Sequence, residues 1–430
     1  MIARTPEPGA ASEQPMTSAP RILMYTQDSF GLGHLRRATN LANELVRRRP
    51  DLSVLLVVDS PVAPFFELAP HVDFLKLPTV VKVDAGVFSP GLLHTDYEHV
   101  RNLRTHLLRE ALVHFAPDVM LVDHMPGGAN RELLPALEHA RRAGLATRVV
   151  LGLRDIIDDP AVTCAVWQRE GVYETLRREY HRVLVYGTQD VFATATEYRL
   201  DEAMDERVDY CGYVCNMSAV QSPERVRARL RLADEPMVVV MGGGGADAAR
   251  LLDTYLEAVP LVARPFASVL VTGPFLPAAQ RRALHARARE LGVRVRTTVG
   301  DALSQIHAAD VIVSMAGYNT VSEILRFGKR AIVVPRPGPS AEQGMRARLF
   351  AARGLFDVLE LGTLEPRALA AALSRTLDPE HVPPPRMVPA LDGLERACTA
   401  LLAELSSTAP ARTGTVTPAA RRVEPTPAGG

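Results

Sequence analysis

An amide, a hydroxyl and a carboxylate follow a glycine where an apolar run ends in the second half of the chain. The run Val311–Ser314 is short enough for a buried parallel strand, and Gly317 permits a tight turn after it. Either Asn319 or Thr320 can then cap a helix. Such a turn directs free backbone N–H groups at an anion, and the helix dipole adds roughly half a positive charge there. We therefore expect Ser314 and the turn residues to bind a diphosphate.

Glu323 lies one turn inside this helix and has two interpretations. It can hold a hydroxyl-bearing ligand, or it can satisfy the N-cap amide as the last member of a capping box, Thr320-Val321-Ser322-Glu323. Those four residues alone favour the capping box. The ligand interpretation gains from the next apolar run, because it ends at Pro335 in a rigid loop that carries Glu342 and Gln343. Strand ends of parallel sheets are where ligands bind.

A second glycine-containing turn follows the first apolar run of the chain. Gly31 and Gly33 let the backbone approach a bulky acceptor, and His34 begins the helix that comes next. An imidazole titrates near neutrality and can take a proton from an attacking hydroxyl, so His34 is our candidate general base. The alternative is that His34 caps the helix or packs under the loop.

Two aspartates at the ends of other predicted strands have similar chemistry. Asp123 and Asp155 could each assist or replace His34 as the base. For Asp155 we favour pairing with the neighbouring residue Arg154 or capping of the next segment, whereas Asp123 and the adjacent His124 stay catalytic candidates. The two arginines after His34, Arg36 and Arg37, are expected to be solvated, although one of them could face an anionic acceptor.

Four consecutive glycines, residues 242–245, follow another apolar run and open a helix. They are a costly choice for a turn alone, because glycine loses more conformational freedom on folding than any other residue. Close approach of the backbone to a phosphate explains the cost. We therefore expect Gly243, Gly244 and Gly245 to contact the diphosphate.

Residues 309–347 resemble the C-terminal domain of glycosyltransferase family 28, which contains the bacterial peptidoglycan N-acetylglucosaminyltransferase and has diacylglycerol galactosyltransferases as relatives. The resemblance implies the GT-B fold. In that family a Gly-x-x-Thr-x-x-Glu segment binds the ribose and diphosphate of a UDP-sugar, and a Gln-rich loop after the next strand binds the sugar. The matching positions here are Gly317, Thr320 and Glu323, then Glu342 and Gln343.

The resemblance also covers the two glycine turns, with departures. Gly33-His34 matches the Gly-His that ends the first glycine-rich loop of the family. Residues 242–245 match a Gly-Gly-Ser type loop without its serine, which implies contacts from backbone N–H groups only. Glu342 stands where Gln is common, and Arg346 where Asn is usual, so the donor sugar stays open. The Asp-x-Asp metal signature of the other glycosyltransferase fold is missing, and we expect neither a metal nor a cofactor.

Apolar strands alternate with helical stretches on both sides of a break, which is the rhythm of doubly wound sheets. We expect an α/β chain of two Rossmann-like domains facing a cleft: an acceptor-side domain over 21–215 and a nucleotide-sugar-binding domain over 216–405.

Residues 1–20 and 406–430 lack apolar periodicity and are expected to be disordered tails. A last helix, from about residue 389, is expected to return to the first domain, as it often does in GT-B proteins. The predicted strands are Arg21–Thr26, Leu52–Val58, Val119–Val122, Arg148–Leu153, Arg182–Tyr186, Met237–Met241, Ser268–Thr272, Arg294–Thr298, Val311–Ser314 and Ala331–Pro335.

Composition excludes several classes of function. The 430 residues carry 49 basic and 49 acidic side chains, so nucleic acid is not an expected partner. The 4 cysteines are too few and too scattered for a disulfide framework. The first twenty residues lack the apolar core of a secretory signal, and no run reaches the ~18 apolar residues of a membrane span. We expect a cytoplasmic protein, with peripheral contact at the inner face of the membrane left open.

Together these features favour an inverting glycosyltransferase. It would transfer a hexose or N-acetylhexosamine from a nucleotide diphosphate-sugar, such as a UDP-sugar, to an acceptor hydroxyl. Lipid-linked sugars, polysaccharide ends and small metabolites all stay open as acceptors. The alternatives are a sugar-nucleotide 2-epimerase of the same fold, or a catalytically silent sugar-nucleotide-binding subunit that supports a partner enzyme.

Overall fold

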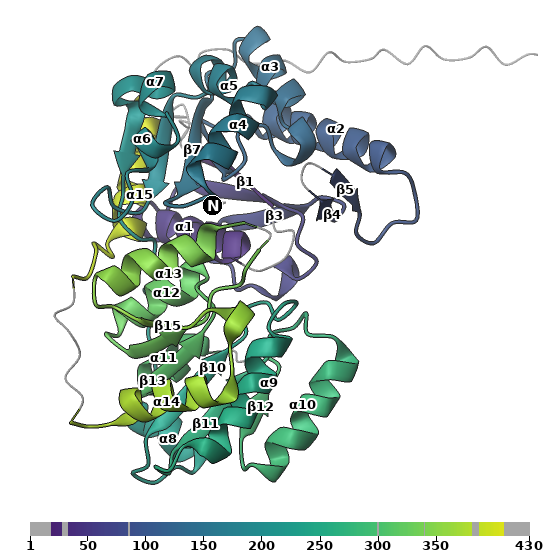
Figure 1. The fold of residues 1–430 in the computed structure, drawn as a ribbon. Helices are drawn as coiled ribbons and strands as arrows, with labels where there is room; N and C mark the ends of the chain where they lie inside the picture. Colours follow the sequence, from purple (N-terminus) through teal and green to yellow (C-terminus); the bar gives the residue numbers. More distant parts are fainter. Residues whose placement is uncertain are drawn as a thin grey trace, which may run out of the picture.

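The computed structural model describes residues 19–27, 33–84, 87–298, 301–338, 340–380 and 387–407. They form two parallel sheets, each flanked by helices and each the centre of one lobe (Figure 1). The tails predicted for 1–20 and 406–430 lie almost wholly outside the described residues, although Ser406 and Ser407 end the last helix.

The N-terminal sheet has seven strands in the order β3-β2-β1-β6-β7-β8-β9, and all its pairings are parallel. A separate antiparallel hairpin joins β4 to β5. The strands are β1 (Arg21–Thr26), β2 (Ser53–Val58), β3 (Val72–Lys76), β4 (Val80–Asp84), β5 (Val87–Pro90), β6 (Val119–Asp123), β7 (Arg148–Arg154), β8 (Arg182–Tyr186) and β9 (Val208–Tyr210). The helices of this part are α1 (Gly33–Arg48), α2 (Tyr97–Phe115), α3 (Leu134–Arg142), α4 (Pro160–Glu170), α5 (Val172–Glu179), α6 (Thr194–Glu197) and α7 (Asp201–Met204).

The C-terminal sheet repeats the design with six parallel strands in the order β12-β11-β10-β13-β14-β15. Its strands are β10 (Met237–Met241), β11 (Ala267–Val271), β12 (Arg294–Arg296), β13 (Val311–Ser314), β14 (Arg330–Val333) and β15 (Asp357–Val358). The helices are α8 (Pro223–Leu230), α9 (Ala249–Ala258), α10 (Ala278–Glu290), α11 (Ala302–Ala308), α12 (Tyr318–Arg326), α13 (Glu342–Ala352), α14 (Pro366–Leu377) and α15 (Gly393–Ser407). Five short 3-10 turns are η1 (Ala63–Phe65), η2 (Ala129–Arg131), η3 (Asp205–Arg207), η4 (Val259–Leu261) and η5 (Leu361–Thr363).

The strand order of each sheet fixes where a ligand can bind. The chain runs outward in one direction from β1 to β2 and then crosses to β6 on the other side of β1, and it does the same around β10, with β11 on one side and β13 on the other. In open parallel sheets the crevice beyond the carboxyl ends of the strands at such a switch point is the usual ligand site. A ligand is therefore expected to contact the residues that follow β1, β6, β10 and β13.

The central strands are apolar for the reason that the sequence predicts. All five residues of β10 are buried, because helices cover both faces of a parallel sheet. The predicted α/β class is confirmed, and four predicted strands, β1, β8, β10 and β13, have the expected bounds. The hairpin and the edge strands β3, β9 and β15 were not predicted, because short edge strands lack the continuous apolar run of a central strand.

The last helix returns to the N-terminal lobe, as expected. In Figure 1 the yellow α15 lies beside the teal strands of that lobe. Glu404 accepts a hydrogen bond from Arg182 at 2.7 Å and is ion-paired with Arg148, both at the start of strands of the N-terminal sheet. Arg48 at the end of α1 donates to the Thr399 hydroxyl at 3.1 Å.

Apolar and aromatic side chains join the two lobes. Tyr213, between β9 and α8, has its ring 5.7 Å from the Tyr318 ring of α12 and 5.6 Å from the Phe350 ring of α13. All three side chains are buried and belong to one core cluster that continues into the N-terminal sheet. In the described parts of the chain, no helix combines the length and the apolar character that crossing a membrane requires.

Candidate functional site

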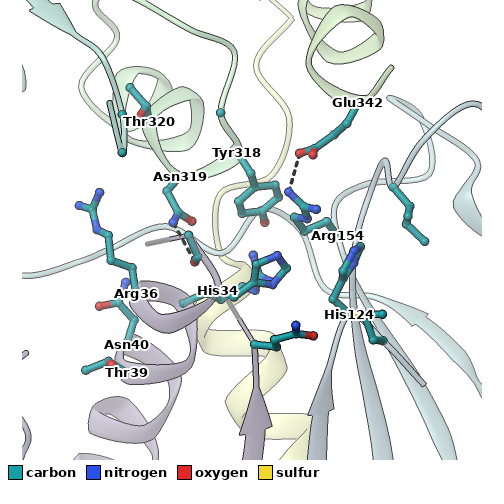
Figure 2. A pocket seen from close by; sticks show the side chains of 18 of the residues that line it. His34, Arg36, Thr39, Asn40, His124, Arg154, Tyr318, Asn319, Thr320 and Glu342 are labelled. Atoms are coloured by element: carbon teal, nitrogen blue, oxygen red, sulfur yellow. Dashed lines mark hydrogen bonds and ion pairs between the residues drawn. The ribbon is translucent and has the colours of Figure 1, made fainter. Parts of the chain in front are cut away.

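A cavity of about 2070 Å³ opens between the two lobes at the carboxyl ends of both sheets. Each switch point contributes to its wall: His34 and His124 follow β1 and β6, and Gly242 and Gly317 follow β10 and β13. Typical pockets for one small ligand have roughly 300–1,000 Å³, so this cavity has room for a donor and an acceptor together. Figure 2 shows His34 and His124 on one side of it and Tyr318 and Asn319 on the other.

The imidazole of His34 is held by a carboxylate from the end of β6. Nδ1 of His34 lies 2.5 Å from Oδ2 of Asp123, and the guanidinium of Arg37, one turn further along α1, binds Oδ1 of the same carboxylate at 2.8 Å. Asp123 and Arg37 are almost fully buried, whereas the His34 side chain is 17% exposed and lines the cavity. Although burial raises the pKa of Asp123, the charges of Arg37 and His34 outweigh it and hold the pKa far below its usual range.

This geometry assigns the protons of His34. A carboxylate can only accept, so Nδ1, which also lies 3.0 Å from Nη2 of Arg37, carries a hydrogen toward Asp123. In the neutral ring the lone pair is then on Nε2. A neutral imidazole in this tautomer can accept a proton from a hydroxyl in the cavity.

His124 and Arg154 complete this side of the cavity. The rings of His34 and His124 have centroids 5.0 Å apart. Burial, followed by the charges of Arg154 and His34, lowers the pKa of His124 well below its usual value, so His124 is neutral at pH 7. Arg154 donates to the Glu342 carboxylate at 2.7 Å across the cavity (Figure 2). The sequence indicated Arg154 only as a partner for Asp155, and its position in the cavity wall was not predicted.

The glycine turn after β10 has two kinds of glycine. Gly243, at φ +60°, has open space where a side chain would begin, and both Gly243 and Gly244 line the cavity. Gly245, at φ +95°, does not line it. It packs against backbone instead, since a Cβ there would lie 2.4 Å from the carbonyl oxygen of Thr272. Gly245 therefore shapes the turn, and only residues 242–244 of the turn line the cavity.

The helix after β13 begins two or three residues earlier than predicted. Gly317 is the N-cap of α12, so Asn319 and Thr320 lie in the first turn of the helix and are not its caps. All three line the cavity. Asn319 also reaches across the cleft, where its amide donates to the carbonyl oxygen of Gly33 at 3.0 Å (Figure 2). The first turns of α1 and α12 thus face each other across the cleft.

The capping-box interpretation of Glu323 is wrong. Its helix begins at Tyr318, so Glu323 lies too far inside to reach the N-cap amide. Its Oε1 instead accepts from Nη2 of Arg36 in α1 at 2.6 Å, while Oε2 is buried with no partner among the described residues. Burial raises the pKa of Glu323, against the lowering charge of Arg36. Glu323 lies behind the cavity wall in this structure and does not line it.

Arg36 and Arg37 are not solvated as predicted. Arg37 is 2% exposed and is committed to Asp123, and Arg36 joins the lobes through Glu323. Sequence reasoning missed them because their partners are 86 and 287 residues away along the chain. The only local signal was a pair of arginines two and three residues after a candidate catalytic histidine.

Glu342 and Arg346, the two departures from the family pattern, are partners. Glu342 accepts from Arg346 at 2.8 Å as well as from Arg154, and Arg346 also binds Asp155 at 3.0 Å. Despite burial, the charges of Arg154 and Arg346 lower the pKa of Glu342 to about 2. Of the two roles favoured for Asp155, pairing with Arg154 was therefore wrong, since its ion-pair partner is Arg346. Asp155 also accepts from the backbone N–H of Ile156, the first residue of the next segment.

The remaining predicted residues have mixed positions. Gln343 lines the cavity and accepts from the backbone N–H of Arg336 at 3.2 Å. Ser314 is fully buried, its hydroxyl has no partner among the described residues, and it does not line the cavity. Gly31 lies outside the described residues. Within the described ranges, no three His, Cys, Asp or Glu side chains are grouped so that they could hold a metal ion.

Comparison with known families identifies the C-terminal half. Residues 237–393 match the family described as "Glycosyltransferase family 28 C-terminal domain". The similar curated proteins are UDP-N-acetylglucosamine–N-acetylmuramyl-(pentapeptide) pyrophosphoryl-undecaprenol N-acetylglucosamine transferases. The one from Agrobacterium fabrum is 35% identical over 92 residues, which are 21% of this chain and 24% of that protein. The one from Verminephrobacter eiseniae is 37% identical over 142 residues, 32% of this chain and 38% of that protein. The chain thus spans well under half the length of these relatives.

Solved structures match over most of the chain. MurG of Acinetobacter baumannii has a TM-score of 0.53 at 15% identity, covering 90% of this chain and 99% of that one. The calicheamicin glycosyltransferase CalG4 has a TM-score of 0.54 at 17% identity, covering 90% and 94%. A putative UDP-N-acetylglucosamine 2-epimerase of Listeria monocytogenes has 0.57 at 13% identity, covering 90% and 96%. At these identities the likeness shows the fold alone. The chain has the GT-B fold, and its residues 237–393 match the glycosyltransferase family 28 C-terminal domain.

Proposed function

We propose that this protein is an inverting glycosyltransferase that uses a UDP-sugar as donor and a hydroxyl group as acceptor. The observation that carries the proposal is the position of His34. Its Nδ1 is hydrogen-bonded to Asp123, which places the lone pair of the neutral ring on Nε2, and the side chain lines the same cavity as the glycine turn and the start of α12. The family 28 domain on the far side of that cavity supports a nucleotide-sugar donor.

The proposed reaction is a single displacement. The acceptor oxygen attacks the anomeric carbon from the His34 side, and its proton passes to Nε2 of His34. As the new C–O bond forms, the bond from the anomeric carbon to the β-phosphate oxygen breaks, and its electron pair leaves with the nucleoside diphosphate. Attack opposite the leaving group inverts the anomeric configuration. Asp123 stabilises the imidazolium that forms, as a fixed negative charge beside a developing positive one.

The donor is proposed to lie along the C-terminal lobe. Gly243 and Gly244 with the first turn of α12 offer backbone N–H groups to the diphosphate, since a helix N-terminus attracts anions. Gln343 and Glu342 are proposed to contact the sugar, and Glu323 to hold the ribose once a donor rearranges its surroundings. We also propose 21–215 and 216–405 as the two domains, each built around one of the sheets, with α15 packed back onto the first.

The names of the curated relatives favour a lipid-linked sugar among the acceptor classes. We propose that class, and with it a cytoplasmic protein that works at the inner face of a membrane. Polysaccharide ends and small metabolites are the other acceptors that a test must include.

The test is a product analysis with labelled donors. The purified protein is incubated with UDP-glucose, UDP-galactose and UDP-N-acetylglucosamine and with acceptors of each class, and the products are separated by mass and by anomeric configuration. A glycosylated acceptor of inverted configuration supports the proposal. Conversion of the donor into its 2-epimer would support the epimerase instead, and donor binding without turnover for every acceptor would support a silent subunit.

A further inference from the structure

Arg336 is the only basic side chain that the C-terminal lobe contributes to the described wall of the cavity. Three acidic side chains of the same lobe, Asp247, Asp301 and Glu342, also line it. A diphosphate brings at least two negative charges into these surroundings. Backbone N–H groups and a helix dipole supply only partial charges, so a full positive charge is needed to offset the acids.

The Arg336 side chain lies between the glycine turn and the start of α13. Its Nη1 is 3.2 Å from Oδ2 of Asp247, which follows the four glycines, and its charge helps to lower the pKa of Glu342 at the first position of α13. Its Nε is buried and has no partner among the described residues. The guanidinium thus has a donor to spare in the part of the cavity that faces the proposed diphosphate site.

The backbone around Arg336 is built to hold it in place. Pro335 and Pro337 flank it, and each proline ring fixes one backbone angle and restricts the residue before it. The Gln343 side chain accepts from the Arg336 backbone N–H at 3.2 Å. A flexible side chain on a fixed backbone can turn from one anion to another without a movement of the loop.

We propose that Arg336 is the cation that binds the donor diphosphate, and that Asp247 holds its guanidinium beside the glycine turn until the donor arrives. The inference rests on the proposed function. During transfer the β-phosphate oxygen gains charge as its bond to the anomeric carbon breaks, and Arg336 would stabilise this charge in a bidentate contact. Arg336 would then add a charged side chain to the backbone N–H contacts that the sequence predicts for the glycine turn.

Calorimetric titration with UDP and with uridine tests the inference, because only UDP carries the diphosphate. Arg336→Gln should weaken UDP binding roughly 10- to 100-fold and leave uridine binding unchanged. Arg336→Lys should lie between the parent and Arg336→Gln, since it keeps the charge and loses the planar fork. Asp247→Asn should bind UDP at least as tightly as the parent, because it removes the competing carboxylate.

Arg287→Gln is the matched control, since Arg287 makes a 2.7 Å ion pair with Asp253 in the same lobe and does not line the cavity. It should bind UDP as the parent does. If Arg336→Gln binds UDP as tightly as the parent, or loses uridine binding equally, the inference is overturned while glycosyl transfer can stand. If Arg336 is required for UDP binding but no donor is transferred to any acceptor, the inference stands and the proposed function fails.

Discussion

Nδ1 of His34 lies 2.5 Å from Oδ2 of Asp123, and Arg37 binds the other oxygen of that carboxylate. Asp123 was predicted to assist or replace His34 as the base, and the structure places the two side chains in direct contact. A buried carboxylate whose pKa is held far below its usual range is a poor base, but it is well suited to fix the tautomer of a neighbouring imidazole.

The first prediction concerns the two members of this pair. His34→Ala should lower turnover by roughly 10²–10⁴, the typical contribution of a general base. Asp123→Asn should also lower kcat, because an amide can donate to Nδ1 and so favour the tautomer whose proton lies on Nε2. Neither change should alter UDP affinity, since the proposed donor site lies on the other lobe. Steady-state kinetics and UDP titration of both variants measure this.

A control on the same lobe is His114→Ala, since this histidine is 78% exposed on α2 and does not line the cavity. It should keep parental turnover. If His34→Ala also keeps near-parental turnover, His34 is not the base, and Asp123 or His124 would have to be tested in its place.

The second prediction concerns Glu323, whose carboxylate is ion-paired with Arg36 in this structure. If donor binding brings Glu323 to the ribose, Glu323→Ala should weaken UDP binding by about 1–3 kcal/mol through loss of a charged hydrogen bond. Arg36→Ala breaks the same 2.6 Å ion pair without removing the carboxylate, so it separates the two roles. UDP calorimetry on the parent and both variants decides.

Arg36→Ala should keep parental UDP affinity. If Glu323→Ala binds UDP as tightly as the parent and only melts earlier, or if Arg36→Ala reproduces its whole loss of affinity, then Glu323 serves to join the lobes and does not contact the ribose.

Much of the architecture could be predicted because strands and helices leave their patterns in short stretches of the sequence. Runs such as Met237–Met241 are apolar along their whole length, and only a strand covered on both faces needs that pattern. The same reasoning predicted that His34, Gly243 and Gly317 would meet, since residues after parallel strands gather at one edge of a sheet.

The charged contacts between the lobes could not be predicted, because they depend on how the two lobes pack. Arg346 binds Asp155, 191 residues away, and nothing local indicates that these two residues meet. The failure at Glu323 has another cause: a four-residue capping pattern was present, but the helix began two residues before it.

The third prediction concerns the pH dependence of stability that Glu342 contributes. Its pKa is lowered from 4.5 to about 2 in the folded protein. Glu342 therefore contributes stability that is fully present above pH 4.5 and is lost as the pH falls toward 2, with a total on the order of 3 kcal/mol. Glu342→Gln should be less stable than the parent at pH 7, and the difference should shrink as the pH falls through this window. Urea unfolding at several pH values measures it.

The matched variant is the double substitution Glu342→Gln with Arg346→Asn, which restores the usual family residues at both positions. It should be less stable at pH 7 than Glu342→Gln alone, because it also removes the guanidinium that pairs with the buried carboxylate of Asp155. A stability difference between parent and Glu342→Gln that stays constant from pH 7 to pH 3 would contradict the assignment of an ionised Glu342.

The last prediction is that donor turnover does not need a divalent metal ion. The sequence contains no Asp-x-Asp signature of the other glycosyltransferase fold, and we propose that the charge a metal would supply comes from Arg336, the glycine turn and the start of α12. Excess EDTA should therefore leave turnover essentially intact, while Arg336→Gln should lower it in the same assay. A metal-dependent glycosyltransferase assayed in the same buffer shows that the chelator is effective. A complete loss of activity with EDTA that manganese or magnesium restores would mean that a metal ion, and not Arg336, carries the charge of the leaving diphosphate.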